Sequence, residues 1–380
     1  MGFGLIITSN DGKQPLPDDI MQWLVEARVE MELSKPTLFA LRFEDDICED
    51  SPAVEGRPEL AANTQIGIFV SRNDKLECLV YGPVTEVKSS SVLGGAGSWV
   101  EIHGLDRRIE MNRVGVQATY TGRDSDAAAG IFSAYGFKTK IQNTLIEYDD
   151  QKNKLTQRAT DLAFIEDIAR RNNMETWITY EAGTNSIVGN INLTETANLQ
   201  TSPHRPQPGD VPQIPTLVPD EGRLLKVNPP PDDCPTVNKF EAKIDYEKPT
   251  ASKGFAMSET EDQAIVEQIV QGAEPVDPAK PVPVDGVTRE VISPPASTPE
   301  QAFLKKEAIV YEQSWFVGVE FSTTLEQIDF LLFPHQIVDV THAGERLAGA
   351  YQVMKVIHVV TATDHFMDGT LRANGLGGGG

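Results

Sequence analysis

Alternation of hydrophobic and charged residues is the strongest pattern in the first third of the chain. The hydrophobic positions of the first run are Val25, Ala27, Val29, Met31 and Leu33. A strict period of two places alternate side chains on one face, so it predicts a strand. Pro36 ends this run, and the range Leu38–Phe43 is predicted to return as the second strand of a hairpin. Further strands are predicted at Gln65–Ser71, Leu76–Val84 and Ser98–Gly104, and such regular spacing is typical of a barrel or sandwich.

The range Leu155–Glu181 predicts a helix followed by a strand. Thr160 is suited to cap the helix, and Asp161 then lies in its first turn, where a carboxylate complements unpaired N–H groups. The hydrophobic residues of one helical face are Leu162, Ile165, Ile168 and Ala169. Asn172 and Asn173 offer a left-handed end to this helix, and alternation from Met174 to Tyr180 then predicts the strand.

A second helix is predicted just before this range, and more elements follow it. Its hydrophobic stripe comprises Ala128, Ile131, Phe132 and Tyr135, with Gly136 as the stop. The range Lys239–Glu247 predicts a strand, and Ser258–Gly272 a helix in which Thr260 and Gln263 resemble a capping box. The closing strands are predicted at Trp315–Thr323, Gln336–Thr341, Ala350–Thr361 and Met367–Ala373. The predicted fold class is therefore α+β and mostly β, with two β-rich ends that resemble distant duplicates.

Proline and charge are unevenly distributed along the 380 residues. Ten prolines lie between Pro203 and Pro235 and seven between Pro275 and Pro299, which predicts extended, poorly packed connections. The first of these segments has a recognition arm as an alternative interpretation. The formal net charge of −23 argues against nucleic-acid binding, because such proteins supply cations to phosphates. No run approaches 18 apolar residues, so no membrane span is predicted, and the N-terminus lacks the basic region of a secretory signal.

No catalytic or metal-binding constellation is apparent in the sequence. Cys48, Cys78 and Cys234 are scattered, which argues against a disulfide framework or zinc site and fits synthesis in a reducing cytoplasm. The six histidines form no HExxH motif, and the acidic run Phe43–Asp50 lacks the EF-hand pattern, leaving weak calcium binding as its alternative. The Gly-rich run Ser89–Trp99 lacks the lysine of a phosphate loop and predicts a hairpin tip. We therefore expect no cofactor, no bound metal and no enzymatic activity. Glu166 and Asp167 are expected on the solvent-exposed face of the helix predicted at Thr160–Asn172.

Four stretches in order resemble the phage late control protein D family of tail hub proteins, which is akin to the N-terminal part of the type VI secretion spike VgrG. The range Thr156–Glu181 is similar to the family's Q-x-x-x-D-L-x-F-I stretch, with Gln157, Asp161 and Phe164 at matching places. The range Val100–Arg113 resembles a strand that ends in Gly-x-Asp, with Asp106 as that Asp. Tyr120–Phe137 resembles the helix that follows it, and Gly349–Asn374, with Tyr351 and His358, resembles the closing strand pair.

The resemblance implies a structural baseplate hub with two tube-type β-barrel domains per chain. Three chains would form a homotrimer that adapts the six-fold tail tube to the three-fold spike. The implied partners are the tail tube protein, the spike protein and other baseplate proteins, and no C-terminal needle or lysozyme-like domain is recognisable. The chain would be made in the cytoplasm and then join a phage tail or an injection particle. The family-motif positions, expected to be structural, are Asp106, Gln157, Thr160, Asp161, Phe164, Tyr351 and His358.

The expected domain organisation follows from this resemblance and from the proline distribution. We expect a first barrel at 1–118, a small α/β region at 119–200 with the Thr160–Asn172 helix, a Pro-rich linker at 201–235, a strand and helix of the second β domain at 236–274, a second linker at 275–300, the second barrel at 301–375 and a flexible Gly tail at 376–380. An acidic lumen that lets DNA or effectors pass without sticking is a further hypothesis. Two alternatives stay open: a tail-associated peptidoglycan hydrolase and an acidic β-rich carbohydrate-binding module.

Overall fold

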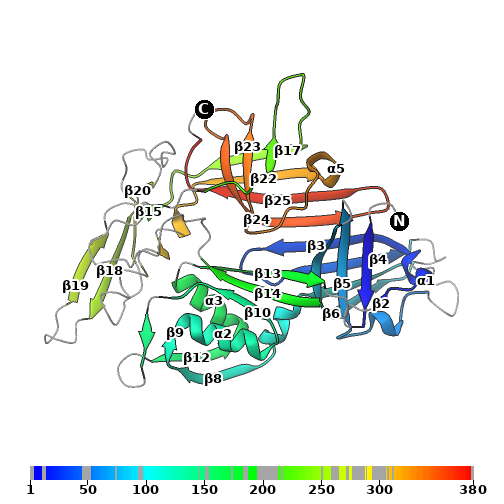
Figure 1. Ribbon diagram of the computed structural model, residues 1–380, viewed down its shortest axis with the longest axis horizontal. Helices are drawn as coiled ribbons and strands as arrows, with labels where there is room; N and C mark the ends of the chain where they lie inside the picture. Colours follow the sequence, from blue (N-terminus) through cyan, green and yellow to red (C-terminus); the bar gives the residue numbers. More distant parts are fainter. Residues whose placement is uncertain are drawn as a thin grey trace.

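The computed structural model of the chain describes residues 4–10, 14–44, 53–72, 75–92, 97–144, 146–149, 154–172, 174–182, 187–194, 213–214, 217–249, 251–257, 265–270, 274–275, 287, 289–292, 305, 308–309, 312–313 and 314–377. It has an α+β fold that is mostly β, as predicted, and its largest element is a 13-stranded sheet (Figure 1).

The first part of the chain forms one end of this sheet and confirms the strands predicted there. Its strands are β1 (Leu5–Ser9), β2 (Gln14–Pro15), β3 (Leu24–Glu32), β4 (Leu38–Glu44), β5 (Gln65–Arg72), β6 (Lys75–Ser90) and β7 (Trp99–Leu105). Its short helices are α1 (Asp18–Met21), η1 (Pro58–Leu60) and η2 (Arg107–Asn112).

The alternating pattern of β3 sets its buried face. Ala27, Val29 and Met31 are at most 4% exposed, whereas Val25 is 40% exposed. The pairing of β3 with β4 shifts register between Leu24 and Glu26. Because such an irregularity breaks the period of two, the buried apolar face of β3 begins at Ala27 and does not include Val25.

The middle of the chain forms a small α/β unit. Its elements are β8 (Gly115–Tyr120), β9 (Gly122–Arg123), α2 (Asp124–Ala134), β10 (Lys138–Ile141), β11 (Glu147–Tyr148), β12 (Leu155–Thr160), α3 (Asp161–Arg171), β13 (Glu175–Ala182) and β14 (Ile187–Thr194). Helices α2 and α3 bury their hydrophobic faces in a common core with residues such as Phe132, Phe164 and Ile168. Figure 1 shows β13 and β14 between these helices and strand β3. Strand β8 starts at Gly115, ahead of the expected boundary at 118, and pairs with β12.

The last part of the chain forms the other end of the large sheet. Its elements are β16 (Leu224–Lys226), β17 (Lys239–Ile244), β22 (Val317–Thr324), α5 (Leu325–Ile328), β23 (Ile337–Thr341), β24 (Gly349–Val360) and β25 (His365–Ala373). The strands predicted from residue 315 onward are confirmed. Figure 1 shows a separate arm made by β15 (Gln213–Ile214), β18 (Ala251–Met257), β19 (Ile265–Val270) and β20 (Glu274–Pro275). Strand β21 (Glu290–Ile292) pairs in parallel with β18.

Two four-stranded blocks of the large sheet have the same topology. The strands lie side by side in the orders β3-β4-β7-β6 and β17-β22-β25-β24, and all neighbours within each block are antiparallel. In each block the first and second strands in chain order are followed in space by the fourth and then the third. The blocks join through antiparallel pairing of β24 with β3, where Lys355 forms an ion pair with Glu30.

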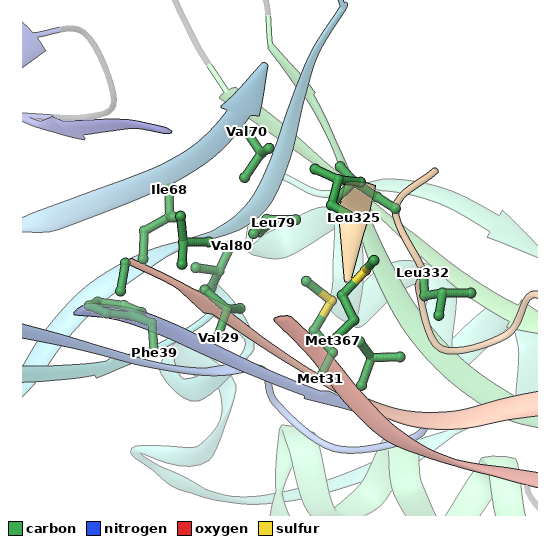
Figure 2. Close-up of a cluster of buried hydrophobic side chains, with 14 of the residues drawn as sticks. Val29, Met31, Phe39, Ile68, Val70, Leu79, Val80, Leu325, Leu332 and Met367 are labelled. Atoms are coloured by element: carbon green, nitrogen blue, oxygen red, sulfur yellow. The ribbon is translucent and has the colours of Figure 1, made fainter. Parts of the chain in front are cut away.

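One hydrophobic core spans both blocks. It joins residues of the first part, such as Val29, Phe39 and Leu79, with residues of the last part, such as Leu332 and Met367 (Figure 2). A fully buried Val, Leu or Phe contributes about 1.5–3 kcal/mol relative to its exposed state. Because both blocks bury these side chains together, the junction of β24 with β3 is stabilised from the core as well as along the backbone.

Several predictions about individual segments are wrong. The helix predicted at Ser258–Gly272 is replaced by strand β19, which pairs with β18; Thr260 and Gln263 lie outside the described residues. Isoleucine and valine dominate β19, and strand pairing satisfies their β preference better than a helix does. Asn172 does not provide a left-handed stop, since its φ is −103°. Its side chain instead donates to Asp124 at 2.8 Å and to the Ile168 carbonyl at 2.9 Å, and Asn173 lies outside the described residues.

The expected linker at 201–235 and the expected Gly tail are partly packed. Leu225 is fully buried in the large core, and β16 pairs in parallel with β23. Leu376 packs against the same core, and the Gly377 N–H donates to the Arg346 carbonyl at 2.9 Å. Apolar residues such as Leu225 explain the packing of an otherwise Pro-rich stretch. The acidic residues from Asp45 to Asp50, and Gly94 and Gly95 of the Gly-rich run, lie outside the described residues.

Candidate functional site

Four of the motif positions, Gln157, Thr160, Asp161 and Phe164, lie together at the start of α3, and two of them, Gln157 and Asp161, share a polar network. The Thr160 hydroxyl accepts from the Ala163 N–H at 3.3 Å and so caps the helix. The Gln157 side-chain amide donates to Asp161 at 2.7 Å, and the Tyr120 hydroxyl donates to Gln157 at 2.6 Å. The other Asp161 oxygen accepts from the Tyr135 hydroxyl at 2.8 Å. Gln157 is fully buried, so this network replaces the water that its amide would otherwise bind.

The electrostatics of this network favour structure over proton transfer. Burial, together with the hydrogen bond and charge of Asp161, raises the pKa of Tyr135 to about 12. Burial and Asp161 also raise the pKa of Tyr120. Both phenols therefore stay protonated at neutral pH and act as donors. The ring of Tyr120 stacks on Phe164 with centroids 5.5 Å apart, which fixes the last of the four motif positions.

Asp106 anchors a different element, the turn between β3 and β4. Its carboxylate accepts from the Thr37 N–H at 2.6 Å, from the Arg108 N–H at 2.8 Å and from the Arg108 guanidinium at 2.7 Å. The same guanidinium donates to the Lys35 carbonyl at 2.6 Å. Burial is the largest single influence and lowers the pKa of Arg108, but the charge and hydrogen bond of Asp106, together with more distant acidic groups, raise that pKa above its ordinary value. Asp106 and Arg108 are at most 3% exposed, so they form a buried ion pair with its donors satisfied locally.

The turn held by Asp106 is where three parts of the chain meet. The Ser34 hydroxyl donates to one oxygen of Glu175, at 2.7 Å, and Arg372 donates to the other at 2.6 Å. Ser34 lies in the first block, Glu175 starts β13 of the α/β unit, and Arg372 lies on β25 of the second block. Arg372 also donates to Gln352 at 2.7 Å, and its guanidinium lies 3.9 Å from the ring centroid of Trp315. We call Ser34, Glu175 and Arg372 the junction triad.

Strand β13 contacts both blocks along its length. The Trp177 ring stacks on His335 with centroids 4.7 Å apart and an interplanar angle of 12°. Further along, the Tyr180 hydroxyl donates to the Tyr81 carbonyl of β6 at 3.1 Å. Burial lowers the pKa of His335 to about 4, so this ring is neutral where it stacks at neutral pH. The α/β unit therefore connects to the large sheet mainly through one strand.

The remaining motif positions lie in the second block. The Tyr351 hydroxyl donates to the Leu347 carbonyl at 2.8 Å, and burial raises its pKa to about 12. His358 is fully buried between the Leu332 carbonyl, 2.9 Å from Nε2, and His365 Nε2, 2.9 Å from Nδ1. Burial and His365 lower the pKa of His358 to about 3. A neutral His358 that donates from Nε2 and accepts at Nδ1 satisfies both contacts.

The junction triad was not foreseen from the sequence. Glu175 and Ser34 are 141 residues apart, and Glu175 and Arg372 are 197 apart. Neither the strand pattern of β13 nor local charge spacing singles out Glu175. A charged residue at the start of a strand is ordinarily expected to be solvent-exposed, and only the packing of three distant segments gives it two partners.

Within the described residues, no group of three or more His, Cys, Asp or Glu side chains could hold a metal ion, and no helix is long and apolar enough to cross a membrane. Asp167 is exposed and Glu166 is half-buried on α3. Burial raises the pKa of Glu166, but the carboxylates that the sequence placed in one motif do not converge on a common cleft.

Comparison with solved structures gives the fold a family context. The 43 kDa tail protein of prophage MuSo2 from Shewanella oneidensis superposes with a TM-score of 0.65 at 10% identity, covering 97% of each chain. The tail protein from Neisseria meningitidis MC58 superposes with a TM-score of 0.62 at 9% identity, covering 98% of this chain and 97% of that one. The chain has the phage tail-protein fold.

The same tail-protein fold extends to a secretion system. An Escherichia coli component of the type VI secretion system, described as structurally similar to the T4 bacteriophage tail proteins gp27 and gp5, superposes with a TM-score of 0.52 at 12% identity. That match covers 92% of this chain and 73% of the other. No known protein family and no curated protein sequence matches the chain. The likeness is thus one of fold, and it supports the resemblance to hub proteins seen in the sequence motifs.

Proposed function

We propose that the chain is a structural baseplate hub of a contractile phage tail or of a phage-derived injection system. In this role three copies form a ring that adapts the six-fold tail tube to the three-fold spike. Its partners are the tube protein, the spike protein and neighbouring baseplate proteins. Support comes from a fold shared with phage tail proteins over nearly the whole of both chains.

The observation that carries the proposal is the repeated four-stranded block. Blocks β3-β4-β7-β6 and β17-β22-β25-β24 have the same strand order and are joined edge to edge through β3 and β24. Two similar blocks per chain and three chains give six similar units around an axis, while the rest of each chain keeps three-fold symmetry. We take each block as the wall of one tube-type barrel domain, the first near 1–118 and the second near 301–375 with β17.

A repeated glycine supports the duplication of the blocks. In the first block Gly104 of β7 lies opposite Phe39 of β4, and in the second Gly369 of β25 lies opposite Phe321 of β22. A Cβ atom at either glycine would overlap the facing phenylalanine ring. The same tight contact thus recurs between the second and fourth strands of both blocks.

The chemistry of the motif residues fits a scaffold better than an enzyme. Asp106, Asp161 and His358 each have their polar atoms occupied by neighbouring protein groups. A general acid or base must lie within hydrogen-bond reach of the substrate, whereas these side chains form hydrogen bonds with other groups of the protein. We therefore assign them to holding turns, helix starts and strand pairs in register.

Co-assembly with a tube protein and a spike protein tests this function. The chain is expressed with each partner from the same gene cluster, and the complexes are sized by light scattering and viewed by electron microscopy. We expect a three-fold ring of three copies that caps the tube on one face and carries the spike on the other. A chain that stays monomeric and binds neither partner would rule the hub role out.

A further inference from the structure

The two ends of the joined blocks are open strand edges. Strand β17 pairs with β22 on one side, and β6 pairs with β7 through Val84–Ser90. On the side away from β7, β6 pairs with β5 only as far as Pro83. Within the described residues no strand pairs with the outer edge of β17 or with the outer edge of Thr85–Ser90. Unpaired edges present backbone donors and acceptors to another strand.

The second block shows what belongs on the open edge of β6. Strand β24 is the counterpart of β6, because each is the third strand of its block in chain order. The first half of β24 pairs with β23, and its second half, from Lys355 to Val360, pairs with β3 on that same side. The first half of β6 likewise pairs with β5. The place that β3 fills on β24 is therefore the place left open on Thr85–Ser90.

Strand β17 of another copy has the right position and direction to pair with the open edge of Thr85–Ser90. It is the first strand of the second block, as β3 is of the first. All neighbours from β17 through to β6 are antiparallel, and eight strands lie in this run. With an even number of alternating strands, the two edges run in opposite directions. Copies joined head to tail therefore meet as antiparallel strands, as β24 and β3 do within the chain.

We propose that β17 of one copy pairs with Thr85–Ser90 of the next, in a heterologous seam that closes the ring. This inference rests on the proposed hub function and names the surface through which its copies join. Such head-to-tail contacts form rings when the rotation closes.

Side chains on both edges select a register. The outward-facing residues are Glu86 and Lys88 on β6 and Lys239, Glu241 and Lys243 on β17, as their cross-strand neighbours show. With Glu86 opposite Lys243, Lys88 lies opposite Glu241, so both pairs have opposite charges. A slip of two residues in one direction sets Lys88 against Lys239, and in the other direction against Lys243. Like charges directly opposite one another are unfavourable.

The inner face agrees with this register. Val87 pairs with the buried Ile102, so it faces the core side, yet it is 47% exposed. The proposed register places Val87 opposite Ala242, between Phe240 and Ile244, which pack against the core. These charged side chains are 46–81% exposed. Their ion pairs among the described residues are with close neighbours in the chain or on the adjacent strand, such as Lys88 with Glu86 at 3.7 Å, so they can exchange partners.

Disulfide capture tests the seam. Val87→Cys and Ala242→Cys are introduced together in a chain that also carries Cys48→Ser and Cys234→Ser, so that the buried Cys78 is the one native thiol left. Facing residues of antiparallel strands lie within disulfide range. On oxidation we expect the double variant to give covalent dimers and trimers. A mixture of the two single variants should give dimers and nothing larger.

Three other outcomes would contradict the proposed seam. Dimers from Val87→Cys alone would show a two-fold contact between β6 edges. A particle of trimeric mass that does not cross-link would refute the seam and leave the hub function standing. A chain that gives no cross-links, stays monomeric and binds neither the tube protein nor the spike protein would refute both. A second test reverses the charges at the seam. Glu86→Lys with Lys88→Glu should raise the protein concentration at which half of the assembly dissociates on the order of tenfold, and adding Glu241→Lys with Lys243→Glu should restore the original value.

Discussion

Glu175 and Arg372 form the tightest ion pair between the α/β unit and the second block, with N and O 2.6 Å apart. Both side chains are at most 18% exposed. Because Ser34 donates to the same carboxylate, one acid holds three parts of the chain in a fixed relation. Such a contact resists relative movement of these parts.

Replacing Glu175 with Gln is expected to loosen this junction. The amide keeps the size of the side chain but loses the charge that Arg372 needs, so the free energy of unfolding should fall by about 1–3 kcal/mol. Urea denaturation followed by tryptophan fluorescence measures the change. Glu181→Gln on the same strand is the control, since its pair with Lys138 is 63% exposed on both sides, and its effect should stay within about 0.5 kcal/mol. Equal effects of the two variants would contradict the role of the triad.

Asp106→Asn is expected to lower the free energy of unfolding more than Glu175→Gln does. It leaves the Arg108 guanidinium buried without a counter-charge, and breaking a buried pair in this way costs about 3–5 kcal/mol. The midpoint of thermal unfolding, measured by circular dichroism, reports the loss. Replacing both residues by apolar ones, as Asp106→Leu with Arg108→Met, should recover much of it. A double variant no better than Asp106→Asn would show that the backbone contacts of Asp106 matter more than the charge pair.

Gly104→Ala should destabilise the first block. The new methyl group would overlap the Phe39 ring and the Pro83 carbonyl, and overpacking of this kind costs about 1–3 kcal/mol. Gly115→Ala is the matched control, because this residue also lies in a strand and a methyl group there would meet no atom within 4 Å. Similar urea midpoints for the two variants would count against the tight glycine–phenylalanine contact.

Stability is expected to fall as the pH drops below about 6.5. The pKa of His335 is about 4 and that of His358 about 3 in the folded chain, against 6.5 for an ordinary histidine. Between these values the unfolded chain binds protons that the folded chain does not, so each histidine lowers stability by up to about 1.4 kcal/mol per pH unit. The loss begins as the pH falls through 6.5 and is complete below the folded values.

Urea titrations at pH 7 and pH 5 measure this dependence. His335→Asn should flatten the slope, since Asn does not titrate and tolerates the positive φ of 83° at this position. Burial raises the pKa of Asp124, which acts in the opposite direction, so the comparison of variant with parent isolates the histidine. An unchanged slope in the variant would show that His335 does not stay neutral in the folded chain.

The sequence by itself determined most of the local structure. Period-two runs identified β3, β4 and the closing strands, and helical spacing with Thr160 as cap identified α3, because these signals depend on neighbours only a few residues apart. The ordered motifs also indicated the relationship to tail proteins. Where local signals were ambiguous the prediction failed: Ile265–Val270 was predicted as part of a helix, and it forms a strand that pairs with β18.

Only the tertiary structure decided how these elements are combined. A period of two shows which face of a strand is buried but not which strand lies next to it, so the pairing of β24 with β3 was not predictable. The face of the large sheet that points away from the core carries Arg28, Lys355 and Lys88 among its glutamates. This face is therefore of mixed charge and not uniformly acidic.

The role of Glu175 also depends on tertiary packing. Its partners lie more than a hundred residues away, and only packing brings them within hydrogen-bond distance.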